Sequence, residues 1–320
     1  DIGPLRVTIS IGGCNFPDYV RTVPDAIRLS EEAMARAKAA GRDRFVAHQP
    51  SEDERLLMKR ADEVGQQLIN AVRSNDVVFA YQPICDATTS QPVFYECLLR
   101  VRRPDGTLAG AGEFVPDVER GGRMMMLDQR ILEMAVEELK AHPNVRLAIN
   151  LSGLTACEPD WIRRADALLR YAPDVAKRLT VEITETAVLR NITECTRTIE
   201  AAKDLGCEVA LDDFGVANIT YRELRALAVH HVKIDAMLVR GLYNNPVNHG
   251  AIQQLVRIAK DYNVQTVAEG IEDVRELQLL QQMGVHYVQG YLLGRPSIER
   301  PWLIKPAENV VHVGTFTRQG

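Results

Sequence analysis

Short apolar segments alternate with amphipathic stretches of helical spacing from about residue 76 onward. Eight apolar segments are present, at 77–84, 93–101, 145–151, 179–184, 208–212, 231–234, 264–268 and 285–288. Amphipathic helices are predicted between most of them, at 126–140, 193–205, 221–228, 248–262 and 274–283. This alternation predicts an α/β fold with a parallel sheet. Eight repeats over about 220 residues fit a TIM-like (β/α)8 barrel better than an open doubly wound sheet. No Gly-x-Gly-x-x-Gly turn follows a strand, which also disfavours a dinucleotide-binding sheet.

The first 50 residues carry a shorter and different pattern. Alternating residues predict a strand at 5–11, closed by two glycines, and a helix follows from Pro24 to about Gly41. Another short strand is predicted at 45–47. Because so few elements cannot bury a core of their own, we interpret residues 1–50 as part of a domain.

A connector is predicted between this fragment and the barrel. Ser51 and Glu54 have the spacing of a capping box, and a charged helix follows at about 52–73. Its mostly polar surface suits a helix that joins two units. The sequence therefore divides into a fragment at 1–50, a connector helix at 51–75, a barrel at 76–305 and a C-terminal tail at 306–320.

Composition and charge exclude several functions. The formal net charge of −5 provides no basic surface for a nucleic-acid polymer, although a few local cations could hold a small phosphorylated ligand. No apolar run is long enough to cross a bilayer, and the N-terminus lacks a signal-peptide pattern. Six scattered cysteines without Cys-x-x-Cys spacing are typical of reduced thiols. We expect a cytoplasmic location, although a region preceding this chain could anchor the whole protein to a membrane.

Two adjacent acids, Asp212 and Asp213, end the fifth apolar segment. Carboxylates this close repel one another and resist desolvation, so a nearby positive charge is expected. A divalent metal is the simplest candidate. The alternative is a solvated turn that carries two acids.

Polar residues also lie in or at the end of the other apolar segments. These residues are Glu96, Asn150, Glu182 with Glu185, Lys233 with Asp235, Glu269 and Gln289. In a barrel the C-terminal strand ends converge on one face, where active sites are built. Carboxylate and amide oxygens suit magnesium, manganese or calcium. The number of carboxylates is sufficient for two metals that share a bridging aspartate, an arrangement typical of phosphoester hydrolysis.

The cations near these positions have two interpretations each. Lys233 could orient an attacking water or neutralise charge on a phosphate, or it could form a salt bridge with Asp235 or another neighbour. Arg100 could hold a phosphate with two hydrogen bonds, or it could be a solvated strand-end arginine. The pair His230-His231 is interpreted as packing or surface rather than as a metal site, because oxygen donors dominate this face.

The polar motifs, in this order, resemble those of the EAL family of cyclic-di-GMP phosphodiesterases over about 76–300. The matching motifs are Tyr81-Gln82-Pro83-Ile84, Glu96-Cys97-Leu98-Leu99-Arg100, Asn150-Leu151-Ser152, Glu182-Ile183-Thr184-Glu185, Asp212-Asp213-Phe214-Gly215, Lys233-Ile234-Asp235, Ala268-Glu269-Gly270-Ile271-Glu272 and Gln289-Gly290-Tyr291. The resemblance implies a TIM-like barrel that hydrolyses cyclic di-GMP to linear pGpG with two Mg²⁺ or Mn²⁺ ions.

The resemblance also implies a role for each matching residue. One metal would be held by Glu96, Asn150, Glu182 and Asp212, and the second by Asp212, Asp213 and Glu269. Lys233 would contact the attacking water, and Gln289 would help to hold the water shell. Gln82 and Arg100 would contact the substrate. Glu185 and Glu272 would support the loop after the fifth strand. The resemblance is also compatible with a homodimer formed through the barrel.

Two departures from the family pattern are present. Cys97 replaces the signature alanine at a position that is not a ligand, so we expect little effect. The loop at 216–220 reads Val-Ala-Asn-Ile-Thr, whereas family members with regulated activity usually carry a stretch similar to Thr-Gly-Tyr-Ser-Ser. Alanine resists backbone conformations that glycine permits, so the coupling of dimerisation to metal binding, or activity itself, is expected to change.

Residues 5–46 resemble the last part of a GGDEF diguanylate cyclase domain. The matching pieces are 7–12 and 32–45, and the cyclase signature is absent from them. The resemblance implies a fragment without cyclase activity.

The leading hypothesis is therefore metal-dependent hydrolysis of cyclic di-GMP in second-messenger signalling. The alternative is a catalytically weak or inactive receptor that binds cyclic di-GMP and signals to a partner. Degenerate members of the family usually lose ligands such as Glu96 or Glu269, which this chain retains. A two-metal hydrolase of another phosphoester is a third interpretation.

Overall fold

A computed structural model describes residues 7–16, 20, 23–215 and 219–303. Eight strands form a closed barrel in the order β3-β11-β10-β9-β8-β7-β6-β4, and the pairing of β3 with β4 closes it. A ninth strand, β5, extends the sheet beyond β4. The strands are β3 (Val77–Asp86), β4 (Pro92–Arg102), β5 (Leu108–Gly110), β6 (Leu147–Asn150), β7 (Leu179–Thr184), β8 (Glu208–Phe214), β9 (His231–Ile234), β10 (Gln265–Ala268) and β11 (Tyr287–Val288). The predicted TIM-like barrel is confirmed.

The prediction of a wholly parallel sheet is wrong for β3. This strand runs antiparallel to both of its neighbours, β4 and β11. Residues 87–91 between β3 and β4 form a tight connection in which Asp86 Oδ1 accepts hydrogen bonds from the Thr88 and Thr89 amides. A parallel pair would need a crossover of about a dozen residues or more, so this short connection forces an antiparallel hairpin.

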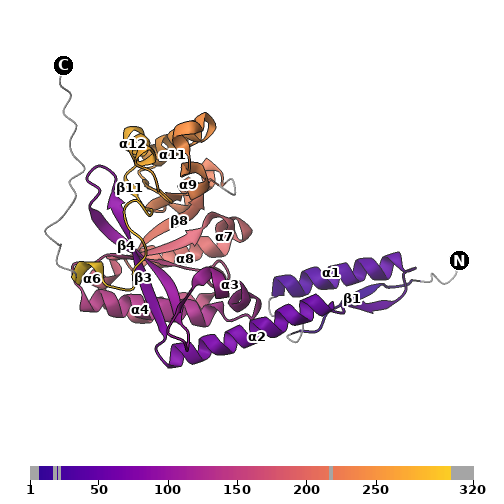
Figure 1. Cartoon of the computed structure of the whole chain (residues 1–320). Coiled ribbons are helices and arrows are strands. Elements are labelled where there is room, and N and C mark those ends of the chain that lie inside the picture. The colour runs from indigo at the N-terminus through magenta and orange to yellow at the C-terminus, as the bar shows by residue number, and fades with distance from the viewer. Residues whose placement is uncertain (1–6, 17–19, 21–22, 216–218, 304–320) are drawn as a thin grey trace, which may run out of the picture.

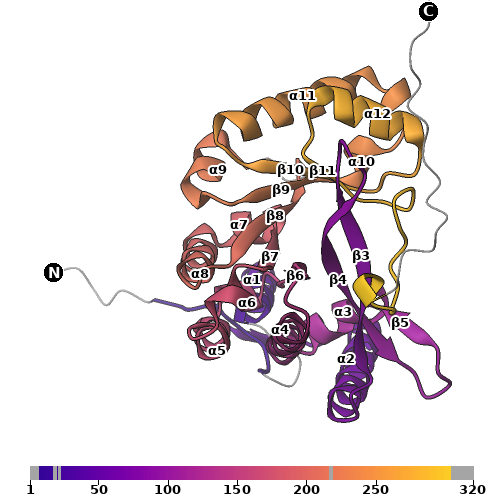
Figure 2. The ribbon, with the colours of Figure 1, turned by 90° about the vertical axis from the view of Figure 1, so that its left-hand side faces the viewer.

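Helices surround the barrel, as Figure 2 shows. They are α3 (Ala111–Arg120), α4 (Met124–Ala141), α5 (Pro159–Leu169), α6 (Pro173–Ala176), α7 (Glu185–Arg190), α8 (Ile192–Asp204), α9 (Tyr221–Leu227), α10 (Ala236–Val239), α11 (Pro246–Asp261) and α12 (Val274–Met283), with 3-10 turns at Thr155–Cys157, Leu242–Asn244 and Pro301–Leu303. The predicted helices correspond to α4, α8, α9, α11 and α12. The main hydrophobic core lies between the strands and these helices.

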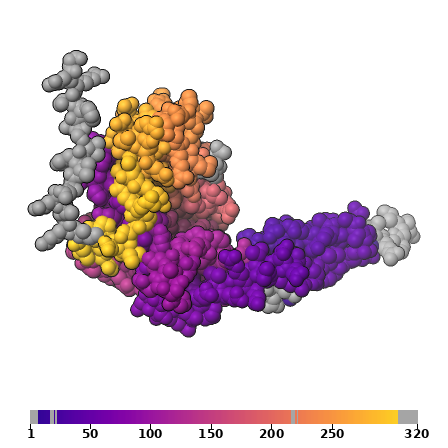
Figure 3. Space-filling view, viewed as in Figure 1, coloured from indigo at the N-terminus to yellow at the C-terminus, as the bar shows by residue number. Residues whose placement is uncertain are grey.

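The N-terminal region projects from the barrel beside the long helix α2 (Glu52–Arg73), as Figures 1 and 3 show. It contains α1 (Val23–Ala39) and a parallel pair of short strands, β1 (Ile11–Gly13) and β2 (Phe45–Ala47). The predicted capping box of Ser51 and Glu54 at the start of α2 is confirmed.

The strand predicted at 5–11 lies elsewhere. Residues 1–6 are outside the described residues, 7–10 are not in a strand, and the strand occupies 11–13. A side chain at Gly12 would overlap the Ser30 carbonyl oxygen and the Met34 backbone of α1. Close contact with the backbone of α1 therefore requires glycine at position 12, which the alternation of residue types did not reveal.

Candidate active site

The polar residues predicted at the strand ends converge around one buried lysine. The Lys233 side chain on β9 is 2% exposed. Its Nζ lies 2.7 Å from Glu182 Oε2, 2.7 Å from Glu269 Oε1, 3.3 Å from Asp212 Oδ1 and 3.7 Å from Glu96 Oε2. Burial lowers the pKa of Lys233, but these carboxylates outweigh burial and hold the pKa well above its usual value. Lys233 therefore remains charged.

The salt bridge considered for Lys233 and Asp235 is not the arrangement in the structure. Asp235 instead accepts a hydrogen bond of 2.6 Å from the Met237 amide at the start of α10. The partners of Lys233 come from β4, β7, β8 and the end of β10, which are distant in sequence. Only closure of the barrel brings them together.

A β-bulge positions the two adjacent acids. Leu211 pairs with Val232 and Phe214 pairs with Ile234, so Asp212 and Asp213 occupy a register shift. Asp213 has a φ of 55°, a left-handed conformation that aspartate tolerates better than most residues. Successive side chains of a regular strand point to opposite faces, and a bulge can re-aim one of them. The bulge allows both acids to face the same site.

Asp212, Asp213 and Glu269 form a compact group of oxygen donors. One carboxylate oxygen from each lies within 4.8 Å of the others. This group is the second ligand set that the resemblance implied. Of the first set, Asn150 and Glu96 are joined by a hydrogen bond of 2.8 Å, while Lys233 contacts Glu182 and Asp212.

The site carries more negative than positive charge. It contains five carboxylates, those of Glu96, Glu182, Asp212, Asp213 and Glu269. Among the described residues, the ion pairs of this group come from one cation, Lys233, which pairs with all of them except Asp213. Burial, then Asp212, raises the pKa of Asp213 to about 6. Burial raises the pKa of Glu269 to about 7 although Lys233 opposes the shift. Burial also holds the pKa of Glu182 well above its usual value. Additional positive charge would favour the ionised carboxylates.

Hydrogen bonds from amide side chains hold Glu96 in place. Gln289 Nε2 donates hydrogen bonds to Glu96 Oε2 at 2.7 Å and to Gln82 Oε1 at 3.2 Å. Burial would raise the pKa of Glu96, but Lys233, Gln289 and Asn150 together lower it. Gln289 Oε1 is buried and has no donor among the described residues. A buried acceptor of this kind requires a partner such as water, so the residues present fit a hydrated metal centre.

The remaining predicted residues lie at the margins. Glu185 accepts hydrogen bonds from the Gly215 amide at 3.0 Å and the Ile219 amide at 2.6 Å, so it holds both sides of 216–218. Residues 216–218 themselves lie outside the described residues. Glu272 lies 3.6 Å from Arg240, and its support of the loop stays a prediction. Arg100 donates to the Leu99 carbonyl oxygen, and its substrate contact also stays a prediction.

Asp128 was not predicted from the sequence. This buried acid on α4 accepts a hydrogen bond of 2.7 Å from Ser152 Oγ, and Ser152 Oγ accepts one from the Thr155 amide. The pair fixes the loop that follows Asn150. Asp128 lies on the apolar side of its helix with Ile131, which was the available signal.

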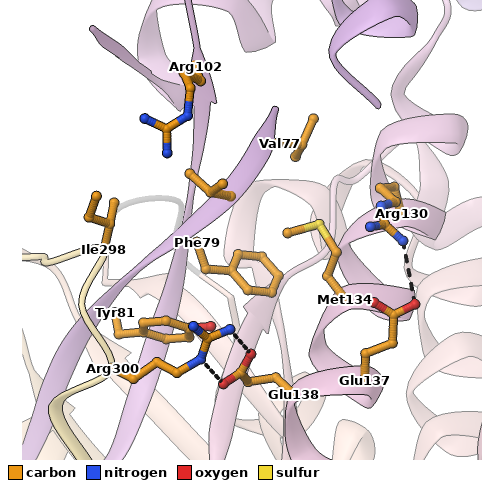
Figure 4. Close-up of a pocket in the computed structure, with 11 residues that line it drawn as sticks. Val77, Phe79, Tyr81, Arg102, Arg130, Met134, Glu137, Glu138, Ile298 and Arg300 are labelled. Carbon is orange, nitrogen blue, oxygen red and sulfur yellow. Dashed lines mark hydrogen bonds and ion pairs between the residues drawn. The ribbon is translucent and has the colours of Figure 1, made fainter. Parts of the chain in front are cut away.

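A pocket of about 490 Å³ lies on the outer face of β3, between Phe79, Met134 of α4 and Ile298 (Figure 4). Arg300 and Glu138 pair across it with contacts of 2.5 and 2.8 Å. It includes none of the predicted site residues, so we place the candidate site at the strand ends.

The α/β barrel with a carboxylate-rich strand-end face defines the general class of the protein. A sequence model of the EAL domain matches residues 66–296, and the chain belongs to this family. The described helices include none that is long and apolar enough to cross a membrane.

Curated relatives and solved structures agree with this assignment. The chain is 26% identical to cyclic di-GMP phosphodiesterase PdeB of Shewanella oneidensis, over 92% of this chain and 34% of that protein. It is 27% identical to cyclic di-GMP phosphodiesterase PdeF of Escherichia coli, over 92% and 40% respectively. The chain thus spans about a third to two fifths of the length of these relatives.

Among solved structures, the PaMucR phosphodiesterase in complex with c-di-GMP has a TM-score of 0.69 and 25% identity, over 73% of this chain and 97% of that one. The FimX EAL domain of Pseudomonas aeruginosa bound to c-di-GMP has a TM-score of 0.68 and 24% identity, over 75% and 97% respectively. The second likeness concerns the fold alone.

Proposed function

We propose that this protein is a metal-dependent phosphodiesterase that hydrolyses cyclic di-GMP to linear pGpG in second-messenger signalling. The observation that carries the proposal is the convergence of five carboxylates, two amides and Lys233 at one end of the barrel. Family membership and relatives named cyclic di-GMP phosphodiesterases support this substrate.

Two Mg²⁺ or Mn²⁺ ions suit the donors, which are oxygens only. Asp212, Asp213 and Glu269 would hold one ion, and Glu96, Asn150, Glu182 and Asp212 would hold the other. Bound metal would lower the pKa of water and stabilise charge on the phosphate oxygens. The excess of negative charge in the site and the raised pKa of Glu269 support this assignment.

The protein residues would orient the water and the substrate. Lys233 stays charged and can donate a hydrogen bond to the attacking water or neutralise charge on the phosphate. Gln289 Oε1 can accept a hydrogen bond from that water shell. Gln82 is fixed beside Gln289 and, with Arg100, would contact the substrate.

A receptor that binds cyclic di-GMP without cleaving it is the second candidate. Lys233 is 2.7 Å from two candidate metal ligands, Glu182 and Glu269, and so competes with metal for their oxygens. Ala217 and Ile219 replace glycine and serine of the usual loop. These features favour a protein with low activity until a signal or dimerisation assembles the centre.

We also propose that residues 1–50 are the last part of a GGDEF-like domain. The bifunctional diguanylate cyclase/cyclic di-GMP phosphodiesterase MucR of Pseudomonas aeruginosa matches 91% of this chain, so its alignment includes residues before 66. The fragment would lack cyclase activity.

Incubation with cyclic di-GMP and Mg²⁺ or Mn²⁺, followed by chromatography, tests the function. We expect pGpG with either metal and none after chelation. The exposed Glu137→Gln variant on α4 is the matched control for expression and handling. Binding without product would favour the receptor, and neither binding nor product would contradict both proposals.

A further inference from the structure

Two free cysteines lie side by side on elements that follow β6 and α7. Cys157 Sγ in the 3-10 turn after β6 is 4.0 Å from Cys195 Sγ at the start of α8. They are 38 residues apart in sequence, and no Cys-x-x-Cys pattern marks them. The six cysteines were predicted to be reduced thiols, and all six are free.

The surrounding contacts hold the two sulfurs in position. Thr198 Oγ1 on α8 donates a hydrogen bond of 2.5 Å to the carbonyl oxygen of Ala156, the residue before Cys157. Thr198 lies three residues after Cys195 and therefore on the same side of the helix. Cys195 Sγ also donates to the Ala187 carbonyl oxygen at 3.6 Å. The loop that carries Cys157 is fixed further by Asp128 through Ser152.

The two thiols differ in access. Cys157 is partly exposed, whereas Cys195 is fully buried. A dissolved oxidant can therefore reach Cys157 first, and the Cys195 sulfur lies 4.0 Å from the Cys157 sulfur. A disulfide has sulfurs about 2.05 Å apart, so the two sulfurs must approach one another by about 2 Å.

We propose that Cys157 and Cys195 form a reversible disulfide when the protein meets a hydroperoxide. The Cys157 thiolate attacks the terminal peroxide oxygen and the O–O bond breaks, which gives Cys157 sulfenic acid. The leaving hydroxide or alkoxide takes up a proton to give water or an alcohol. Cys195 sulfur then attacks the Cys157 sulfur, the S–O bond breaks, and the Cys195 proton leaves with the oxygen as water. The sulfurs lose two electrons and the peroxide gains them. A dithiol restores both thiols by exchange.

The disulfide would join the loop after Asn150 to α8. This loop follows a candidate metal ligand, and α8 follows α7, which begins with Glu185. Oxidation would thus tie together two supports of the strand-end face. The inference about the disulfide does not depend on the proposed hydrolysis.

Peptide mapping after hydrogen peroxide treatment tests the proposal. We expect a linked peptide that contains Cys157 and Cys195, and its complete loss after dithiothreitol. Cys157→Ser and Cys195→Ser should each abolish it. Cys14→Ser is the matched control and should retain it, because partly exposed Cys14 contacts Ser30 and the Ala26 carbonyl oxygen rather than another cysteine.

Two further experiments test the contact that holds the turn against α8 and the sulfenic acid intermediate. Thr198→Val removes the hydrogen bond to Ala156 and should slow disulfide formation several-fold without preventing it. Dimedone should trap sulfenic acid at Cys157 in the Cys195→Ser variant. The proposal is overturned if the protein without substitutions accumulates sulfenic acid at Cys157 but yields no linked peptide. Linkage of Cys157 to a cysteine other than Cys195 would also overturn it.

Discussion

Both ends of the barrel carry ionisable groups on β8 and β9, but the balance of negative and positive charge differs between them. At the N-terminal end, Glu208 pairs with Arg146 at 2.6 Å and with His231 at 2.8 Å. Burial would raise the pKa of Glu208, but His231 and Arg146 lower it. At the C-terminal end one lysine faces several carboxylates, and the pKa values of Glu182 and Glu269 are raised.

This difference supports our proposal that the cluster around Lys233 binds metal, whereas the cluster around Glu208 is structural. Arg146 and the hydrogen bond with His231 favour the ionised form of Glu208, so this carboxylate has its partners within the fold. The acids around Lys233 are incompletely neutralised, which is expected of a site built for an additional cation. In barrels of this type the N-terminal end usually contributes to stability, and the C-terminal end carries the active site.

The largest expected effect is the loss of hydrolysis in Asp212→Ala and in Glu96→Ala. Each change removes a candidate metal ligand, so turnover of cyclic di-GMP should fall about 10³-fold or more. Both variants should remain folded because Glu182 and Glu269 still pair with Lys233. Chromatography of pGpG and circular dichroism check this pair of outcomes. Turnover like that of the unchanged protein in either variant would refute the metal assignment.

Glu208→Gln should show the reverse pattern. The variant loses a charged partner of Arg146 and His231, so the free energy of unfolding should fall by about 1–2 kcal/mol with turnover unchanged. The folded pKa of Glu208 is lowered from 4.5, so its stabilisation is present above 4.5 and is lost as pH falls through the folded value. Denaturant titrations at about pH 7 and about pH 3.5 measure the difference in free energy of unfolding between the unchanged protein and the variant. This difference should be smaller at the lower pH. An equal difference at both would contradict the electrostatic explanation.

The loop at 216–220 tests whether the catalytic end is complete. Restoring Thr-Gly through Val216→Thr with Ala217→Gly should raise turnover several-fold or change its dependence on dimerisation, because glycine permits more backbone conformations. Turnover against protein concentration measures both effects. If neither changes, this loop does not limit activity.

Asp128→Asn should have the smallest effect. Burial raises the folded pKa of Asp128 from 3.8 to about 6, so the ionised acid destabilises the fold as pH rises through this range. As pH rises from 3.8 to 6, the thermal unfolding midpoint of the Asp128→Asn variant should therefore increase relative to that of the unchanged protein. Thermal melting curves of both proteins at several pH values measure this difference in midpoint. A difference that does not change with pH would show that Asp128 does not ionise in this range.

Much of the candidate site was predictable because polar residues at strand ends of a barrel must share a face. Asp212, Glu269 and Gln289 were identified on that basis before their contacts were known. Asp128 and the pair of Cys157 with Cys195 were not, since their partners lie on other elements at unrelated sequence distances.

The sequence by itself determined the eight-strand barrel and the identity of the polar strand ends, because the periodicity of apolar and polar residues is encoded over a few residues. Tertiary structure alone decided the pairing of β3 with β11, the bulge at Asp212-Asp213 and the placement of Lys233 among four carboxylates. Register, burial and the resulting pKa values depend on neighbours brought together only by folding, and those neighbours set the charge balance of the site.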